Sequence, residues 1–436
     1  MIIDSSIACI IADDLTGAND SSLQFHLHGS DTQILLSDEV DNLDVNDAQT
    51  WAISTETRNI EPNEAYEKVK YITEKMANKF SPDYFFKKID STIRGNIAVE
   101  TLGMLEILGW DAAVIIPAFP AEGRVTVGGY HLLRGVPIER TEMARDPFSP
   151  IRESHLPTML TEQAGENNKD IVASLSLKEV MKGAGPILQK LNELIASGKK
   201  LIVADAVSTT DIEQVVLAIN KSEHKILPAG TAATARALSN LWFSDLNPKV
   251  MADEIPELPK LVISGSVTEI TESQIRAFEN SDEFENNSII VTLDMETILS
   301  GVSEELVERI VANLGKNNIV VVHTSNIVRN FDGFSDTSFD AELTRDKLAC
   351  MITDFLSELT KRVSEKKEAL LVLLGGETSY KCCRAIGATQ LKLIDEVSPA
   401  IALSLDYNSR WIVTKSGNLG GSNTLIDILK YFEKHE

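Results

Sequence analysis

The stretch IACIIADDLTGAND, residues 7–20, starts with a short apolar run and ends in charged and small residues. An apolar run of this length, rich in isoleucine, is typical of a buried strand in a parallel sheet. Asp13 and Asp14 follow directly, and Gly17 allows a turn into the next segment. Since open α/β sheets bind ligands at the carboxyl ends of their strands, these carboxylates are expected at a binding edge. A single aspartate here could simply cap a helix, but two before Thr-Gly favour a functional role.

Short runs rich in valine and isoleucine alternate with longer amphipathic stretches through the whole chain. This alternation predicts crossover helices between parallel strands, so we expect two α/β domains with mainly parallel sheets and a cleft between them. Helices are expected over 61–80 and 96–109. The expected strands are 7–12, 32–36, 51–54, 84–88, 112–117, 201–204 and 225–228 in the first half, and 261–264, 289–293, 319–323, 369–374, 400–403 and 411–414 in the second.

Two tracts lack regular periodicity. Residues 244–259, SDLNPKVMADEIPELP, contain three of the fourteen prolines and are expected to link the domains. The first domain is therefore expected to cover 1–250 and the second 256–436. Residues 135–157 contain RDPFSP and HLP and are expected to form an extended excursion, of the kind used as a lid or an oligomer contact.

The composition limits the partners and the location of the protein. The 436 residues include 41 basic and 65 acidic ones, which gives a formal net charge of −24. Such a charge repels nucleic acid and anionic membrane surfaces, so neither is an expected partner. The four cysteines lack metal-ligand spacing, and the sequence contains neither a basic, apolar leader nor about 20 consecutive apolar residues. These features predict a cytoplasmic protein.

A cationic stretch follows another predicted strand. Residues 87–95 read KKIDSTIRG, with three cations in eight residues, and these cations together with Ser91, Thr92 and nearby amides could bind an anion. The alternative is a solvated turn with incidental charges. Arg58 follows a further strand and is expected at the same edge. The stretch 117–124, PAFPAEGR, is expected either to close over the site or to be a rigid turn.

Three glycine turns follow predicted strands in the second domain. They are Ser264-Gly265-Ser266, the GGETS stretch of 375–379 and the GNLGG stretch of 417–421. Each alone has a packing explanation, but three in one domain suggest a nucleotide, because backbone amides approach phosphates only where no Cβ intervenes. The absence of G-x-x-x-x-G-K-[ST] from the sequence excludes a P-loop kinase, and no G-x-G-x-x-G follows the first strand.

Six motifs resemble those of the four-carbon acid sugar kinases, in the family's order and over nearly the whole chain. They are IADDLTGAND (11–20), KKIDSTIRGN (87–96), IPAFPAEGRVTVGGY (116–130), ISGSVTEIT (263–271), LLGGETS (373–379) and TKSGNLGG (414–421). The resemblance implies an N-terminal sugar-acid-binding domain and a C-terminal nucleotide-binding domain. It also implies phosphorylation of the terminal hydroxyl of a tetronic acid with ATP and Mg²⁺. Leu419 stands where the family often has phenylalanine, which should alter loop packing rather than phosphate contacts.

The resemblance also implies the residues of the site. Asp14 or Asp90 would orient or deprotonate the C4 hydroxyl, and Arg58 or Lys88 would hold the substrate carboxylate. The expected substrate residues are Asp14, Arg58, Lys88, Asp90, Ser91 and Arg94. The expected nucleotide residues are Ser264, Ser266, Gly375, Gly376, Glu377, Thr378, Gly417 and Gly420.

Residues 141–147, TEMARDP, are closer to the threonate and erythronate kinases than to the 3-oxo-tetronate kinases, so D-threonate is the predicted substrate. D-Erythronate and 3-oxo-tetronates are the alternatives. The rival from another class is a non-catalytic two-domain sensor of small anions, and a dehydrogenase ranks third. Two distinct sites favour the enzyme. The acidic surface and the long central loop permit a homodimer.

Overall fold

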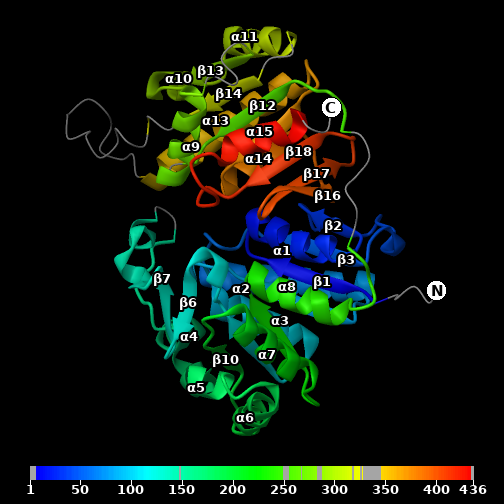
Figure 1. Ribbon diagram of the computed structural model, residues 1–436, viewed down its shortest axis with the longest axis vertical. Helices are drawn as coiled ribbons and strands as arrows, with labels where there is room; N and C mark the ends of the chain where they lie inside the picture. The colour runs from blue at the N-terminus through cyan, green and yellow to red at the C-terminus, as the bar shows by residue number, and fades with distance from the viewer. Residues whose placement is uncertain are drawn as a thin grey trace. The chain divides into compact units, whose positions relative to one another are not determined.

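The structure is a computed structural model that describes residues 6–146, 149–248, 255–266, 268–281, 287–316, 319–324, 327 and 345–433. The chain divides into two compact units, Met1–Lys249 and Val250–Glu436 (Figure 1). Each unit is an α/β domain, as the alternation of apolar and amphipathic stretches predicts. The cleft expected between the domains stays a prediction. No helix among the described residues has the length and apolarity to cross a membrane.

The N-terminal unit is built on a fully parallel sheet of order β2-β3-β1-β4-β11-β5-β10-β9. Its central strands are buried from end to end because helices cover both faces. The strands are β1 (Ala8–Ala12), β2 (Thr32–Leu35), β3 (Thr50–Ser54), β4 (Tyr84–Lys88), β5 (Ala112–Ile116), β9 (Val172–Leu175), β10 (Leu201–Ala204) and β11 (Ile226–Gly230).

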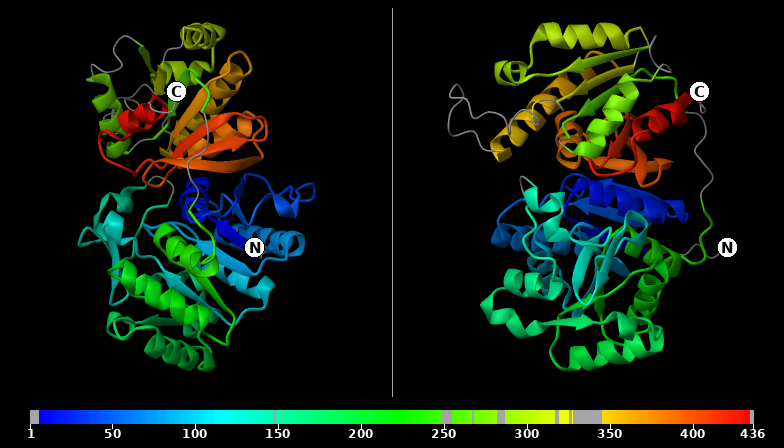
Figure 2. Two further views of the ribbon diagram at one scale, coloured as in Figure 1. Left: turned by 45° about the vertical axis from the view of Figure 1, so that its right-hand side comes forward. Right: turned by 60° about the vertical axis from the view of Figure 1, so that its left-hand side comes forward.

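Helices α1, α7 and α8 form one packed group on this sheet, and α2, α3 and α4 form another (Figure 2). In α2 the residues Ala65, Val69, Ile72 and Met76 recur at helical spacing and are buried. The helices are α1 (Leu15–Leu27), α2 (Pro62–Phe80), α3 (Ile97–Leu108), α4 (Leu156–Ala164), α5 (Leu177–Val180), α6 (Ala184–Ala196), α7 (Thr209–Asn220) and α8 (Ala232–Trp242), with the 3₁₀ turns η1 (Val45–Asp47) and η5 (Glu166–Ile171).

A small antiparallel sheet interrupts the N-terminal unit between β5 and α4. It contains β6 (Arg124–Val127), β7 (Tyr130–Leu133) and β8 (Val136–Pro137). The prediction missed the β6–β7 hairpin, although its signal is in the sequence. Gly128 and Gly129 form the two-residue loop with φ of +60° and +78°, a conformation that favours glycine.

The expectation of an irregular excursion over 135–157 is wrong in part. The segment contains β8, the 3₁₀ turns η3 (Ile138–Arg140) and η4 (Glu142–Arg145), and the start of α4. Buried Ile138 and Met143 attach these short turns to the core of the unit. The turns are too short to show a helical period, so no sequence pattern predicts them.

The C-terminal unit contains a sheet of order β13-β14-β12-β15-β18-β17-β16. The first five strands run parallel, and β17 and β16 are antiparallel to their neighbours. The strands are β12 (Lys260–Ser264), β13 (Ser288–Thr292), β14 (Ile319–His323), β15 (Leu370–Leu374), β16 (Gln390–Ser398), β17 (Ile401–Asp406) and β18 (Trp411–Lys415). The helices are α9 (Glu269–Glu279), α10 (Met295–Ser300), α11 (Glu304–Leu314), α13 (Arg345–Ser364), α14 (Gly376–Ala385) and α15 (Thr424–Glu433).

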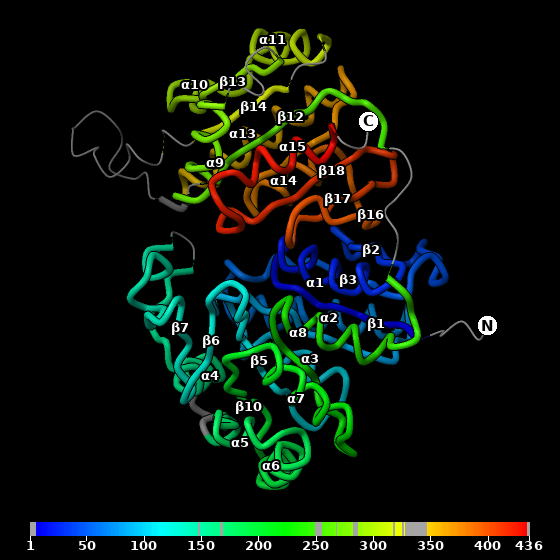
Figure 3. The backbone as a smooth tube through the Cα atoms, in the orientation of Figure 1, coloured from blue at the N-terminus to red at the C-terminus, as the bar shows by residue number. Residues whose placement is uncertain are grey.

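All thirteen strands predicted from the sequence are present, with ends that shift by at most three residues (Figure 3). Strand β9 in the large sheet of the N-terminal unit and strand β16 in the sheet of the C-terminal unit were not predicted. Strand β16 carries charged residues among its apolar ones, since one part of it is exposed, so it lacks the continuous apolar run of the parallel strands.

Candidate active site

Three neighbouring strands of the N-terminal unit end at the same level. Ala12 of β1 lies in register with Ser54 of β3 and with Lys88 of β4. The polar residues that follow these strands therefore gather at one edge of the sheet. The structure brings together Asp14, Arg58, Lys88, Asp90 and Arg94 here, together with Asp13.

Arg58 is surrounded by carboxylates. Its Nε lies 2.7 Å from Asp13 Oδ2, its Nη1 lies 2.7 Å from Asp14 Oδ2, and its Nη2 lies 3.7 Å from Asp90 Oδ1. Burial opposes the charge, but the three carboxylates hold the pKa of Arg58 above its ordinary value. The guanidinium is thus already compensated by the protein itself.

Asp14 has two roles in the structure. It is the N-cap of α1, where its Oδ1 accepts a hydrogen bond of 2.7 Å from the Gly17 amide, and its other oxygen pairs with Arg58. Burial raises the pKa of Asp14. The nearby carboxylates of Asp13 and Asp90 raise it further, whereas the cations Arg58 and Lys88 lower it. A carboxylate with a raised pKa is a better proton acceptor at neutral pH.

The surroundings of Asp90 shift its pKa in the opposite direction to that of Asp14. It accepts hydrogen bonds from the Thr92 hydroxyl, from Arg94 Nε at 2.8 Å and from the Arg94 amide at 3.2 Å. Although burial opposes ionisation, Arg94 and Arg58 hold the pKa of Asp90 well below its usual range. Arg94 also pairs with Asp146 at 2.7 Å, so it too is compensated by two carboxylates.

Lys88 is almost fully buried, and its Nζ donates a 2.8 Å hydrogen bond to the Ile89 carbonyl. Asp20 Oδ1 lies 3.6 Å from the same nitrogen. A Cβ on Gly17 would meet Asp14 Oδ1 at 2.8 Å and Lys88 Nζ at 2.9 Å, so a larger residue here would require these side chains to shift. Asp20 is a site residue that the sequence reasoning did not select, although it ends the first motif.

Asp20 is expected to make the stability of the protein depend on pH. Burial raises the pKa of Asp20 to about 6. Lys88 opposes this shift, and the carboxylate of Asp14 adds to it. A carboxyl whose folded pKa lies above its unfolded value stabilises the fold at low pH, and this contribution disappears as the pH rises from about 4 to about 6. Asp20→Asn should therefore raise the free energy of unfolding by about 1 to 3 kcal/mol at pH 7.5 and by almost nothing at pH 4.

Urea unfolding at the two pH values measures this difference, and Asp41→Asn at an exposed position is the control. Equal effects of Asp20→Asn at both pH values would contradict the assignment.

Ser91 faces Arg124 rather than the carboxylates. Arg124 Nη1 donates to Ser91 Oγ at 2.9 Å, and His131 Nε2 lies 2.9 Å from the Ser91 carbonyl oxygen. Burial lowers the pKa of His131 to about 4, so a neutral imidazole holds this carbonyl. The stretch 117–124, expected either to close over the site or to be a rigid turn, supplies one more cation through Arg124.

Arg124 differs from the other cations of the cluster. Among the described residues no carboxylate forms an ion pair with it, and its Nε is buried without a hydrogen-bond partner. Burial lowers the pKa of Arg124. Beneath the cluster, by contrast, the fully buried Lys87 pairs with Glu100 at 2.7 Å.

Three strand ends also meet in the C-terminal unit. Ser264 of β12 is in register with Leu374 of β15, which is in register with Lys415 of β18. Thr268 and Thr271 of the α9 start donate to the Gly417 carbonyl at 2.7 and 2.8 Å. The glycine turns after the three strands are therefore one assembly.

Close packing explains the glycines in these turns. A Cβ on Gly417 would meet Ser266 Oγ at 2.4 Å, and one on Gly265 would meet Thr378 Oγ1 at 2.5 Å. Gly375 has a φ of +113°. The structure thus brings Ser264, Ser266, Gly375, Thr378 and Gly417 together.

The remaining predicted nucleotide residues lie around this assembly. Gly376 and Glu377 begin α14, where Glu377 also lies 3.6 Å from Lys381. Gly420 lies against Thr424 of α15 and has a φ of +84°, so packing and backbone conformation both account for it. Leu419, the departure from the family pattern, packs against the core of the unit.

Two buried polar groups at this edge stand out. Ser264 Oγ is buried and has no hydrogen-bond partner among the residues of known position, and Lys415 is 1% exposed. Lys415 is a residue that sequence reasoning missed, since a single lysine at the end of a strand carries no distinctive pattern.

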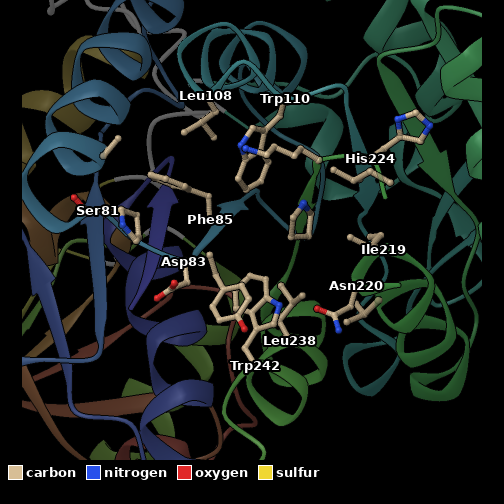
Figure 4. A pocket seen from close by; sticks show the side chains of 17 residues that line it. Ser81, Asp83, Phe85, Leu108, Trp110, Ile219, Asn220, His224, Leu238 and Trp242 are labelled. Carbon is tan, nitrogen blue, oxygen red and sulfur yellow. The ribbon is translucent and has the colours of Figure 1, made fainter. Parts of the chain in front are cut away.

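Two pockets of the N-terminal unit differ in where they lie. One of about 380 Å³ borders the cluster and is lined by Arg58, Ile93 and Gly95, among others. The other, of about 440 Å³, is lined by Trp110, Trp242 and the first residues of β4 and β11 (Figure 4). It lies at the amino edge of the sheet, away from the edge where α/β sheets bind ligands.

Comparison with known proteins connects both sites to one family. A model described as a sugar-binding N-terminal domain matches residues 8–238, and one described as a nucleotide-binding C-terminal domain matches residues 261–425. A D-erythronate kinase of Heliobacterium modesticaldum is 28% identical over 97% of this chain and 96% of its own. A D-threonate kinase of Salmonella typhimurium is 28% identical over 98% of each chain.

A relative of lower sequence identity and a solved structure point to the same family and the same fold. A 3-oxo-tetronate kinase of Brucella melitensis is 24% identical over 94% of this chain and 92% of its own. The crystal structure of a Haemophilus influenzae protein has the same fold, with a TM-score of 0.73 and 22% identity over 97% of this chain and 100% of that one. With both domain models matched and full-length relatives of this kind, the chain belongs to the four-carbon acid sugar kinase family.

Proposed function

We propose that this protein transfers the γ-phosphoryl group of ATP to the C4 hydroxyl of a four-carbon sugar acid, and that the acid is D-threonate. The observation that carries the proposal is the buried cluster at the ends of β1, β3 and β4, where Asp14 with its raised pKa lies beside cations. The relatives named for D-threonate, D-erythronate and 3-oxo-tetronate support a tetronate as the acceptor.

Arg124 is our choice for the residue that holds the substrate carboxylate. Arg58 and Lys88, the cations expected in this role, already face carboxylates of the protein. Arg124 has no such partner among the described residues, and its buried Nε needs an acceptor. A carboxylate from the substrate would supply both the counter-charge and the hydrogen bond.

Asp14 is our choice for the general base. As the C4 oxygen bonds to the γ-phosphorus, the bond from that phosphorus to the ADP oxygen breaks, and the hydroxyl proton passes to Asp14. Asp90 is a poorer acceptor because its pKa is held low. We assign it instead to the positioning of Arg58 and Arg94. Positioning and charge neutralisation account for most of the catalysis in such transfers.

ATP fits the glycine turns of the C-terminal domain. We assign its contacts to Ser264, Ser266, Gly375, Thr378 and Gly417, since these polar and glycine residues gather where three strands end and α14 begins. Among the described residues no three His, Cys, Asp or Glu side chains are grouped to hold a metal ion. Mg²⁺ bound with the nucleotide would neutralise phosphate charge.

A turnover assay tests the proposal. The purified protein is mixed with ATP, Mg²⁺ and, separately, D-threonate, D-erythronate or a 3-oxo-tetronate, and ADP release is followed. The highest kcat/KM is expected with D-threonate, with a product phosphorylated at C4. A higher kcat/KM with another tetronate would correct the substrate. Binding of the acid without ADP release would replace the kinase by a small-anion sensor.

Arg124→Met tests the carboxylate assignment. Loss of a charge-assisted hydrogen bond should raise KM for the sugar acid by about 10- to 100-fold and leave KM for ATP nearly unchanged. Arg134→Met, at an exposed position in the turn between β7 and β8, is the control and should change neither KM. An unchanged KM for the acid in Arg124→Met would return the role to Arg58 or Lys88.

A further inference from the structure

We propose that Lys415 is the cation that binds the terminal phosphates of the nucleotide in the C-terminal domain. The inference rests on the proposed function and deepens it. It assigns the charge recognition of the nucleotide to a residue outside the glycine turns.

The position of Lys415 points to the phosphate end of the site. It is the last residue of β18, and its carbonyl accepts a 2.8 Å hydrogen bond from the Gly375 amide. Through Leu374 it stands in register with Ser264. Lys415 therefore lies in the row of strand ends from which all three glycine turns leave.

The charge of Lys415 has no partner charge. Its Nζ donates to the Ser416 carbonyl at 2.6 Å, and within the described parts of the chain no carboxylate pairs with it. Lys87 is just as buried but has Glu100 at 2.7 Å. A buried cation without an anion is costly, so the protein alone leaves this one uncompensated. Burial accordingly lowers the pKa of Lys415 to about 7.

A second polar group at the same edge also lacks a partner. Ser264 is 1% exposed, and its Oγ makes no hydrogen bond to any residue that the structure describes. An unsatisfied hydroxyl and an uncompensated ammonium at one edge of the sheet are the complement of a polyphosphate, which offers negative charge and many acceptor oxygens. The alternative is a structural lysine that is satisfied by the Ser416 carbonyl, and this alternative predicts no effect on nucleotide binding.

Three substitutions separate charge from hydrogen bonding. Lys415→Gln keeps a donor for the Ser416 carbonyl and removes the charge, Lys415→Met removes both, and Lys415→Arg keeps the charge. Calorimetric titration of the intact protein with ADP and with adenosine measures phosphate recognition independently of turnover. Lys392→Met, at an exposed position of β16, is the control.

We expect Lys415→Gln and Lys415→Met to weaken ADP binding by about 10- to 100-fold and to leave adenosine binding within about twofold, because a charge-assisted contact is lost. Lys415→Arg should retain more ADP affinity than either. Without nucleotide, the melting temperature of Lys415→Met should rise by about 2 to 8 °C, since a buried charge is removed.

Two results would overturn the inference, and they are distinguishable. If the wild-type protein binds ADP and Lys415→Gln binds it equally well, the lysine has no part in phosphate recognition, whereas the proposed function stands. If the wild-type protein binds neither ADP nor ATP, the proposed function fails and the inference with it. If Lys415→Met does not fold, Lys415→Gln with its retained donor decides the question.

Discussion

Replacing Asp14 with asparagine is expected to lower kcat by about 100-fold or more, because general-base catalysis contributes about 10²- to 10⁴-fold. Asparagine is as good an N-cap as aspartate, so the start of α1 and the bond to the Gly17 amide should survive the change. The loss should therefore appear in kcat at saturating sugar acid and ATP. Steady-state kinetics with D-threonate measures it, and ATP binding should be nearly unchanged.

The same substitution at another cap provides the control. Asp44 is exposed and caps the short helix η1 through the Asn46 amide at 2.9 Å. Asp44→Asn should leave kcat unchanged. If Asp14→Asn retains wild-type kcat, Asp14 is not the base. A kcat lost instead in Asp90→Asn, in a protein of unaltered stability, would transfer the role to Asp90.

Replacing Arg58 with methionine is expected to lower the free energy of unfolding by about 3 to 5 kcal/mol, the cost of leaving buried charges without their partner. Without the guanidinium, the carboxylates of Asp13, Asp14 and Asp90 would face one another across a buried site. The cost should be lower at acid pH, because the carboxylates, no longer stabilised by Arg58, take up protons there.

Urea unfolding of the Arg58→Met protein at pH 7.5 and pH 5 tests both parts. Arg140→Met removes a guanidinium that is 75% exposed and lies 3.6 Å from Glu139, so it should change stability by less than about 0.5 kcal/mol. A loss of substrate affinity in Arg58→Met with wild-type stability at both pH values would show that Arg58 serves the ligand rather than the carboxylates.

The cations of the two sites are of two kinds. Arg58, Arg94 and Lys87 face carboxylates of the protein and stabilise the arrangement of the site. Lys415 is buried and Arg124 is half-buried with a buried Nε, and no carboxylate among the described residues pairs with either. Since an uncompensated buried charge lowers stability, the second kind is where a bound anion has most to contribute.

The sequence was sufficient to predict the strands and the place where the polar groups gather. Runs such as those of β1 and β4 are apolar enough to identify buried parallel strands. Because such strands all point their carboxyl ends to one edge, Asp14 and Lys88 could be expected together from their position after a strand. The β6–β7 hairpin was missed although its Gly-Gly turn is visible, and β16 was missed because most of its residues are only partly buried.

Only the tertiary structure shows which cations have no carboxylate partner among the described residues. Asp13, Arg58 and Asp90 follow three different strands, and their pairing depends on strand order and on side-chain direction, neither of which leaves a local pattern. The same holds for Lys415, whose burial results from the packing around β18. Sequence periodicity indicates which face of one segment is buried and which is exposed to water. Charge compensation depends instead on distances between segments that are far apart in the chain.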